Sequence, residues 1–204
     1  IQINNTTSTY ETMSEDELTK LISETNAQVQ KLEQRKNELS SQLNALKDTA
    51  DKNEKAAEIA KQNAQTNGIL SGRLAATGEG VVIRISQGSK QKIDSAILFT
   101  LLEELRNSGA EVIEINNVRV VTSTYISGTA GSLVCDGTKL KSPFTIRAIG
   151  DSDNLQNAVN LAGGVGSRLK VKYGATVSVS PSDKVMIKST RQAPQYTYAH
   201  VIGQ

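Results

Sequence analysis

The side chains best suited to chemistry are four arginines on or beside expected strands and a turn: Arg84, Arg119, Arg147 and Arg168. A guanidinium group binds carboxylates and phosphates through two parallel hydrogen bonds. Arginines that converge on one face of a sheet would therefore form an anion-binding site. Solvated strand faces are the commoner use of such residues. The sequence leaves both interpretations open, with Arg84, Arg119 and Arg147 as the tentative anion-binding residues.

Two short motifs resemble ligand-binding loops. "GGVGSR" at 163–168 is rich in glycine, but it lacks the Gly-Lys-Ser/Thr ending of a phosphate loop and follows an expected helix instead of a strand. "DSDN" at 151–154 resembles the start of a calcium loop without its later Gly and final Glu. We interpret the first motif as a helix stop with a tight turn, and the second as a helix N-cap at Asp151 or Asp153.

The single histidine and the single cysteine do not suggest a catalytic site. His200 lies in a polar tail with no carboxylate or cysteine close by in sequence, and Cys135 has no second cysteine to pair with. Cys135 is most simply a small core residue. We expect no enzymatic activity, no catalytic residues, no metal site and no cofactor.

Length and composition set wider bounds. The 204 residues allow one domain of ordinary size plus an additional segment. Residues 1–73 contain 9 Lys and Arg against 11 Asp and Glu, whereas residues 74–204 contain 14 against 10, an excess too small to indicate nucleic-acid binding. No window of about 20 apolar residues is present. The chain opens on Ile-Gln-Ile without Met, which leaves a preceding segment open.

A long helix is expected over 14–67, after a disordered lead at 1–13. Ser14 and Glu17 form a capping box at its start. A 3-4 spacing then continues for more than six heptads, which is typical of a left-handed coiled coil. A single amphipathic helix lying on the globular domain is the alternative. The predicted coiled-coil seam includes Ile22, Val29, Leu32, Leu39, Leu43 and Leu46.

After a linker at 68–77, residues 78–190 are predicted to form an α+β domain, followed by a polar tail at 191–204. Helices are expected after the strands at 78–86 and 142–150. Residues 132–140 form a strand or a loose hairpin. The remaining strands are expected at 110–116, 118–127, 175–180 and 184–188, the last two joined by a "PSD" turn. Two β-α-β-β units in this order predict a ferredoxin-like sheet with helices on one face.

The stretch "LRNSGAEVIEINNVRV" at 105–120 gives the clearest local prediction. Gly109 is expected to end a helix in the left-handed conformation, and Asn116-Asn117 to form a two-residue hairpin turn. Its other polar residues are interpreted as solvated: Arg106, Asn107, Glu111 and Glu114.

Four stretches behind a coiled-coil helix resemble one family: "GEGVVIRI", "LLEELRNSGAEVIEINNVRV", "SPFTIRAIGD" and "LAGGVGSRL…YGATVSV…DKVMI". They are similar to the YlxW/YlxX family of Gram-positive bacteria, a domain of unknown function catalogued as number eight-eight-one. The resemblance covers roughly residues 14–190. It implies a single-pass membrane anchor absent from this chain, a soluble part outside the cytoplasm and genes near cell-division genes. It brings no functional residues.

Two functions are consistent with these observations. The first is a non-enzymatic, membrane-anchored scaffold that forms a coiled-coil homodimer and docks a partner through its α+β domain, with membrane division proteins as the candidate partners. The second is an extracytoplasmic sensor that binds a small anionic ligand or cell-wall fragment.

Overall fold

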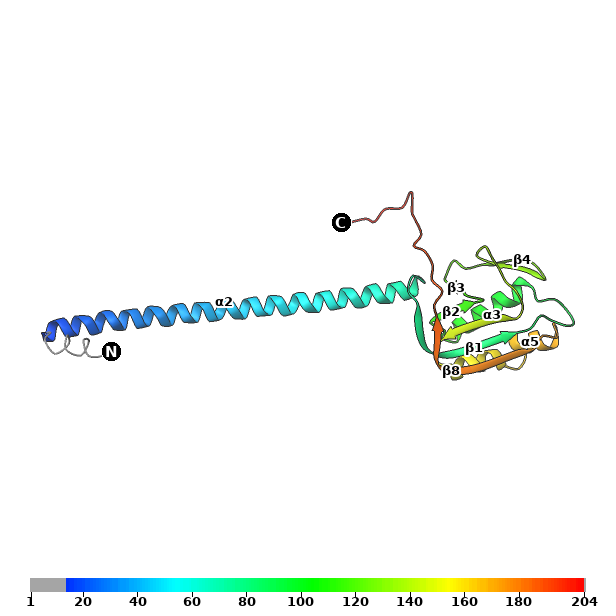
Figure 1. The fold of residues 1–204 in the computed structure, drawn as a ribbon, viewed down its shortest axis with the longest axis horizontal. Helices are drawn as coiled ribbons and strands as arrows, with labels where there is room; N and C mark the ends of the chain where they lie inside the picture. The colour runs from blue at the N-terminus through cyan, green and yellow to red at the C-terminus, as the bar shows by residue number, and fades with distance from the viewer. Residues whose placement is uncertain (1–13, 204) are drawn as a thin grey trace, which may run out of the picture. The chain divides into compact units, whose positions relative to one another are not determined.

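The computed structural model describes residues 14–203, so the lead expected at 1–13 lies outside the described residues. The chain divides into two compact units, at residues 1–60 and 61–204. From Glu15 onward, the described part of the first unit is helical. The second contains the last turns of that helix and all the strands (Figure 1).

Helix α2 (Glu15–Leu70) has 56 residues. Its start confirms the capping box, because the Ser14 amide donates to Glu17 Oε2 over 3.0 Å and the Glu17 amide donates to Ser14 Oγ over 3.4 Å. The helix continues past Gly68 to Leu70, further than expected. A Cβ at Gly68 would lie 2.5 Å from Leu74 Cδ1, so a larger residue there would displace this partly exposed side chain where the chain folds back after the helix.

The main sheet is antiparallel and has the strand order β3-β2-β7-β1-β8. Helix α3 connects β1 to β2, and helices α4 and α5 connect β7 to β8. The strands of this sheet are β1 (Ala76–Ile85), β2 (Val112–Ile115), β3 (Val118–Val120), β7 (Phe144–Ile149) and β8 (Val177–Ile187). The helices are α3 (Ser95–Asn107), α4 (Ser152–Asn160) and α5 (Val165–Val171).

All three helices of the domain pack against one face of this sheet. Alternate strand residues such as Val81, Ile83 and Ile85 are fully buried beneath them. The inner face of α3 is formed by Ile97, Leu98, Leu101, Leu102 and Leu105, every one of them buried. Gly166 allows α5 to lie close to α4, because a Cβ there would be 2.0 Å from the Val159 carbonyl oxygen.

The turns predicted within 105–120 are confirmed. Gly109 has φ +92°, and its amide donates to the Arg106 carbonyl while the Ala110 amide donates to the Leu105 carbonyl. These two bonds form a Schellman motif. Asn116 and Asn117 have φ values of 45° and 63°, as a type I′ hairpin turn requires.

Two strand predictions are wrong. The "PSD" turn does not exist, because Pro181 and Asp183 lie within the continuous strand β8. This strand is at the edge of the sheet, where a proline without an N–H is tolerated. The pairing of β8 with β1 shifts register between Gly78 and Gly80, so the strand continues past this break in the regular ladder. The second half of the domain is therefore β-α-β and not the expected β-α-β-β unit.

The strand expected at 118–127 is also divided between two sheets. β3 ends at Val120, and β4 (Ile126–Thr129) joins β5 (Ser132–Cys135) and β6 (Thr138–Lys139) in a small second sheet. Of the strand or loose hairpin predicted at 132–140, the structure has the hairpin, formed by β5 and β6. Leu133 and Cys135 extend from β5 into the main core.

Asp94 joins the start of α3 to the segment after α5. One carboxylate oxygen accepts from the Ile97 amide over 2.9 Å as an N-cap, and the other accepts from the Tyr173 hydroxyl over 2.7 Å. Burial and this hydrogen bond raise the pKa of Tyr173 to about 12.

The raised pKa predicts an alkaline limit to stability. The phenol ionises near pH 10 in the unfolded chain and near 12 in the folded one, so its contribution is full below pH 10 and is lost between pH 10 and 12. In urea unfolding at pH 9 to 11.5, Tyr173→Phe should lose part of the wild-type decline in unfolding free energy. The exposed Tyr125→Phe should keep it. Equal slopes for wild type and Tyr173→Phe would contradict this linkage.

Candidate functional site

The face of the main sheet opposite the helices carries the charged strand residues. Arg84 pairs with Thr145, Arg147 pairs with both Val82 and Glu114, and Glu114 pairs with Arg119. Because side chains alternate along a strand and paired residues share a face, the arginines at 84, 119 and 147 project from the same side. We call this the polar face. The fourth arginine, Arg168, lies on α5 instead.

One end of the polar face is covered. Val112 and Ile149 belong to this face by register, and they are buried with Val185 and Ile187 in a small apolar cluster. The last part of β8 therefore folds over this end of the sheet. This arrangement brings the chain after β8 close to Glu114 and Arg119, far from β8 in the strand order.

Arg119 is 2% exposed, and its guanidinium is used to hold the backbone together. Nη1 donates to the carbonyls of Leu74 and Ser189 over 2.9 and 3.1 Å, and Nη2 donates to the carbonyl of Ile69 over 2.9 Å. Burial lowers the pKa of Arg119, and the nearby Glu114 carboxylate opposes this effect. Arg119 is thus a structural residue that joins the end of α2, the approach to β1 and the exit from β8.

Glu114 and Arg147 form an ion pair within the same face. Glu114 is 2% exposed, although its position in an alternating strand suggested a solvated side chain. Its Oε1 accepts from Arg147 Nη1 over 2.8 Å and its Oε2 accepts from Ser189 Oγ over 2.6 Å. Arg147 keeps about a third of its side chain exposed. Among the arginines predicted to bind an anion, Arg147 is therefore the one whose guanidinium is held by a partner while part of its side chain remains exposed to solvent.

Two hollows open beside Arg147. The larger, of about 530 Å³, lies between the polar face and β8 and includes Glu114, Lys184 and Lys188 in its lining. The smaller, of about 350 Å³, includes Lys139 and Lys141. Arg147 and Asn117 line both. Sequence reasoning missed the four lysines, because they come from two separate segments, around β6 and around the end of β8, that only the fold brings together.

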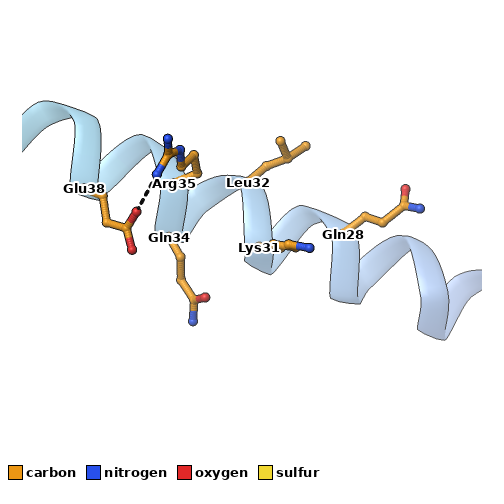
Figure 2. Close-up of a pocket in the computed structure, with 6 residues that line it drawn as sticks. All are labelled: Gln28, Lys31, Leu32, Gln34, Arg35 and Glu38. Carbon is orange, nitrogen blue, oxygen red and sulfur yellow. Dashed lines mark hydrogen bonds and ion pairs between the residues drawn. The ribbon is translucent and has the colours of Figure 1, made fainter.

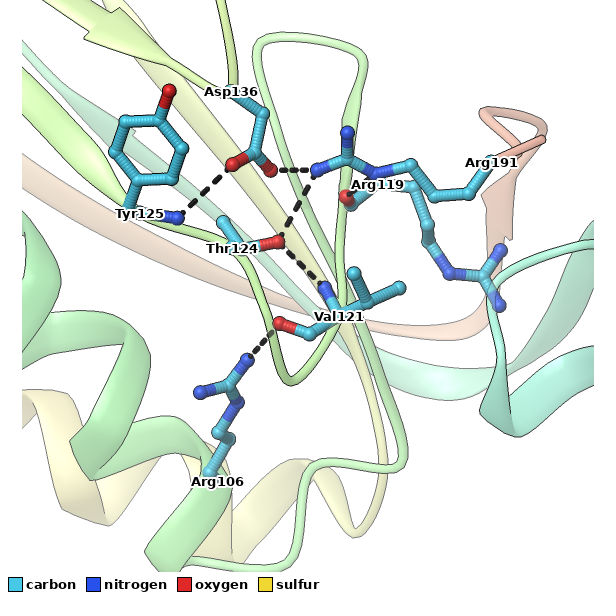
Figure 3. Close-up of polar contacts among 7 residues, drawn as sticks. All are labelled: Arg106, Arg119, Val121, Thr124, Tyr125, Asp136 and Arg191. Carbon is cyan, nitrogen blue, oxygen red and sulfur yellow. Dashed lines mark hydrogen bonds and ion pairs between the residues drawn. The ribbon is translucent and has the colours of Figure 1, made fainter. Parts of the chain in front are cut away.

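A second polar cluster holds the start of the chain after β8, where a polar tail was expected from residue 191 on (Figure 3). Arg191 donates to the Arg119 carbonyl over 2.8 Å, to Thr124 Oγ1 over 3.2 Å and to the Asp136 carboxylate. Arg106, expected to be solvated, donates to the Val121 carbonyl over 2.7 Å. Each of these groups has a structural partner, so the cluster fixes the loop between β3 and β4.

The remaining motifs have structural roles. Asp151 caps α4 by accepting from the Asn154 amide over 2.9 Å, and Gly163 has φ +75° where the chain turns between α4 and α5. Cys135 is completely buried, which raises the pKa of its thiol, while Arg191 opposes that effect. His200 is exposed. Across residues 14–203, no three His, Cys, Asp or Glu side chains are grouped as metal ligands would be.

Comparisons with known proteins agree on one family, whose function is unknown. The family described as "bacterial protein of unknown function (DUF881)" matches residues 63–200. The UPF0749 protein Rv1825 of Mycobacterium tuberculosis (strain ATCC 25618 / H37Rv) is 34% identical over 169 residues, covering 81% of this chain and 57% of the relative. The UPF0749 protein YlxW of Bacillus subtilis (strain 168) is 30% identical over 126 residues, covering 57% of this chain and 54% of the relative. The chain thus spans little more than half of these relatives.

A solved structure also matches. It is the crystal structure of an uncharacterized conserved protein from Mycobacterium tuberculosis, with a TM-score of 0.63 and 35% identity. The match covers 69% of this chain and 99% of that one. Within residues 14–203, no helix combines the length and apolarity required to cross a membrane.

The contacts of Arg119 predict a large loss of stability on substitution. Arg119→Gln should lower the free energy of unfolding by about 2–4 kcal/mol, because buried carbonyls from three segments lose a charged donor. Arg84→Gln removes the same charge from an exposed position of the polar face and should change it by less than about 0.5 kcal/mol. Urea unfolding followed by tyrosine fluorescence measures both. Equal effects would contradict the role assigned to Arg119.

Proposed function

The chain belongs to the DUF881 family of bacterial proteins of unknown function, and we propose that it is a non-enzymatic scaffold that dimerises through α2. The observation that carries the proposal is an unpartnered apolar stripe on a 56-residue helix. Its residues Ile22, Val29, Leu32, Leu39, Leu43 and Leu46 are 48 to 69% exposed in the single chain. Burying this stripe against a second copy removes its apolar area from water.

Figure 2 shows one part of this stripe. Leu32 projects from α2 beside Gln28, Lys31 and Arg35, and the Arg35–Glu38 ion pair of 3.1 Å lies one turn further along. Among residues 14–60, the hollow at this position is lined by residues of α2 alone, so this part of the chain gives it no opposite wall. Such a surface suits a side chain from another helix, in the knobs-into-holes manner.

The residue types along the seam of α2 support a parallel coiled coil of two helices. In the heptad, the a positions of the seam are Ile22, Val29 and Leu43, two of them β-branched, and the d positions are Leu32, Leu39 and Leu46. β-branched residues at a with leucine at d favour parallel dimers. Lys36, at the a position between Val29 and Leu43, is the kind of polar residue that fixes register at a cost in stability.

The finer parts of the proposal come from the family resemblance. They are a membrane anchor, a position outside the cytoplasm, and a division protein docked by the α+β domain. For that domain we propose a ferredoxin-like core, which the strand order β2-β7-β1-β8 and the helical connections α3 and α4–α5 support. The anion sensor is the second candidate, favoured by the hollows beside Arg147.

Sedimentation of the chain tests the dimer. The wild-type chain should sediment as a dimer, whereas Leu32→Ser with Leu39→Ser should be monomeric, because two core layers of the coil become polar. Gln34→Ser with Asp48→Ser, on the outer f positions, should leave the dimer intact. A wild-type chain that remains monomeric at high micromolar concentration would rule out self-association through this stripe.

The cellular part of the proposal needs the full-length protein. A fluorescent fusion should concentrate at the division septum of growing cells, and division proteins should co-purify with it. The Leu32→Ser, Leu39→Ser variant should lose that enrichment if dimerisation is required. A uniform distribution, with no division proteins recovered, would contradict the link to division.

A further inference from the structure

We propose that the two hollows beside Arg147 form one binding groove for a soluble chain of phosphate groups. This site is independent of dimerisation through α2. The groove is defined by Arg147, Lys184 and Lys188 in the larger hollow and by Lys139 and Lys141 in the smaller one. Among residues 14–203, Glu114 is the one carboxylate that lines either hollow, so the cationic side chains outnumber it five to one.

Arg147 is positioned to bind an anion at the centre of this groove. A guanidinium has five N–H donors. One of them reaches Glu114 Oε1, and the structure records no other protein acceptor for Arg147 within residues 14–203. The remaining donors can therefore meet an anionic oxygen from solvent. Because Arg147 is only partly exposed, that interaction is less screened by water than one with a surface lysine.

Glu114 acts as a positioning residue for Arg147. Its two carboxylate oxygens are already used, one by Arg147 and the other by Ser189 Oγ. The carboxylate fixes one edge of the guanidinium, so less side-chain entropy is lost when a ligand binds. The ion pair therefore prepares Arg147 for an anion without saturating it.

The arrangement of charges favours an extended ligand with several phosphates. Each hollow has its own pair of lysines, and Arg147 and Asn117 are common to both. One phosphate group at Arg147 would have a neighbour on either side within reach of lysines. Arginine matches phosphate geometry through paired hydrogen bonds, and lysine adds compact charge. Both hollows are open to solvent, which suits a linear chain better than an enclosed metabolite.

Titration calorimetry of the chain with inorganic tripolyphosphate tests the groove. At low ionic strength tripolyphosphate should bind, and both orthophosphate and citrate should bind at least about tenfold more weakly, because they lack a chain of phosphates. Raising the salt concentration should weaken binding, since the contacts are charged. Absence of tripolyphosphate binding, or citrate binding of equal strength, would overturn the proposal.

Matched variants separate the groove from general positive charge. Arg147→Gln should weaken binding by about tenfold or more, whereas Arg84→Gln on the same face should change it by less than about twofold. Because Arg147→Gln also leaves Glu114 without its ion-pair partner, the exposed pair Lys184→Gln and Lys188→Gln provides a second test. That pair should weaken binding by about fivefold or more, and Lys170→Gln with Lys172→Gln on the α5 side should not. Equal losses within each matched comparison would overturn the site.

Vesicles containing phosphatidylglycerol distinguish a lipid headgroup from a soluble ligand. The chain should remain in the supernatant when such vesicles are sedimented. Cosedimentation that Arg147→Gln abolishes, without tripolyphosphate binding, would assign the groove to a membrane surface and overturn the soluble phosphate chain.

Discussion

The arrangement of the domain depends on the hydrogen bonds that the buried guanidinium of Arg119 donates to the backbone. Water has little access to this guanidinium because Arg119 is almost completely buried, and three of its five N–H donors bond to the carbonyls of Ile69, Leu74 and Ser189. These residues belong to the segments that lead into the sheet before β1 and leave it after β8. Holding them together on β3 brings Ser189 to Glu114, and Glu114 in turn orients Arg147. A charge in the interior therefore determines the geometry of the surface.

Local chemistry explains which parts of the fold were predictable from sequence. The capping box at Ser14 and Glu17, the left-handed Gly109 and the Asn116-Asn117 turn each depend on residues within a few positions, and each is confirmed. The α+β class also follows from such local signals. Whether α2 pairs with a second helix depends on a partner that a single chain does not contain.

Long-range contacts explain what sequence reasoning missed. Glu114 stands in a strand with regular alternation, which predicts solvent on its side of the sheet. It is buried because β8 folds over that side and brings Ser189 to it, across 75 residues of chain. The continuity of β8 through Pro181 has a similar origin, since the strand is specified by pairing with β1 rather than by its own sequence. Local patterns carry no information about either contact.

The position of Pro181 has a consequence for how copies of this protein meet. An open sheet exposes unpaired backbone N–H and C=O groups along its two edge strands, and these groups can pair with the edge strand of another sheet. Here one outer strand, β3, has three residues, and the other, β8, contains a proline, an aspartate and a lysine. Both borders are poor templates for uncontrolled stacking into fibres. The domain can thus be present at high concentration without polymerising through the borders of its sheet.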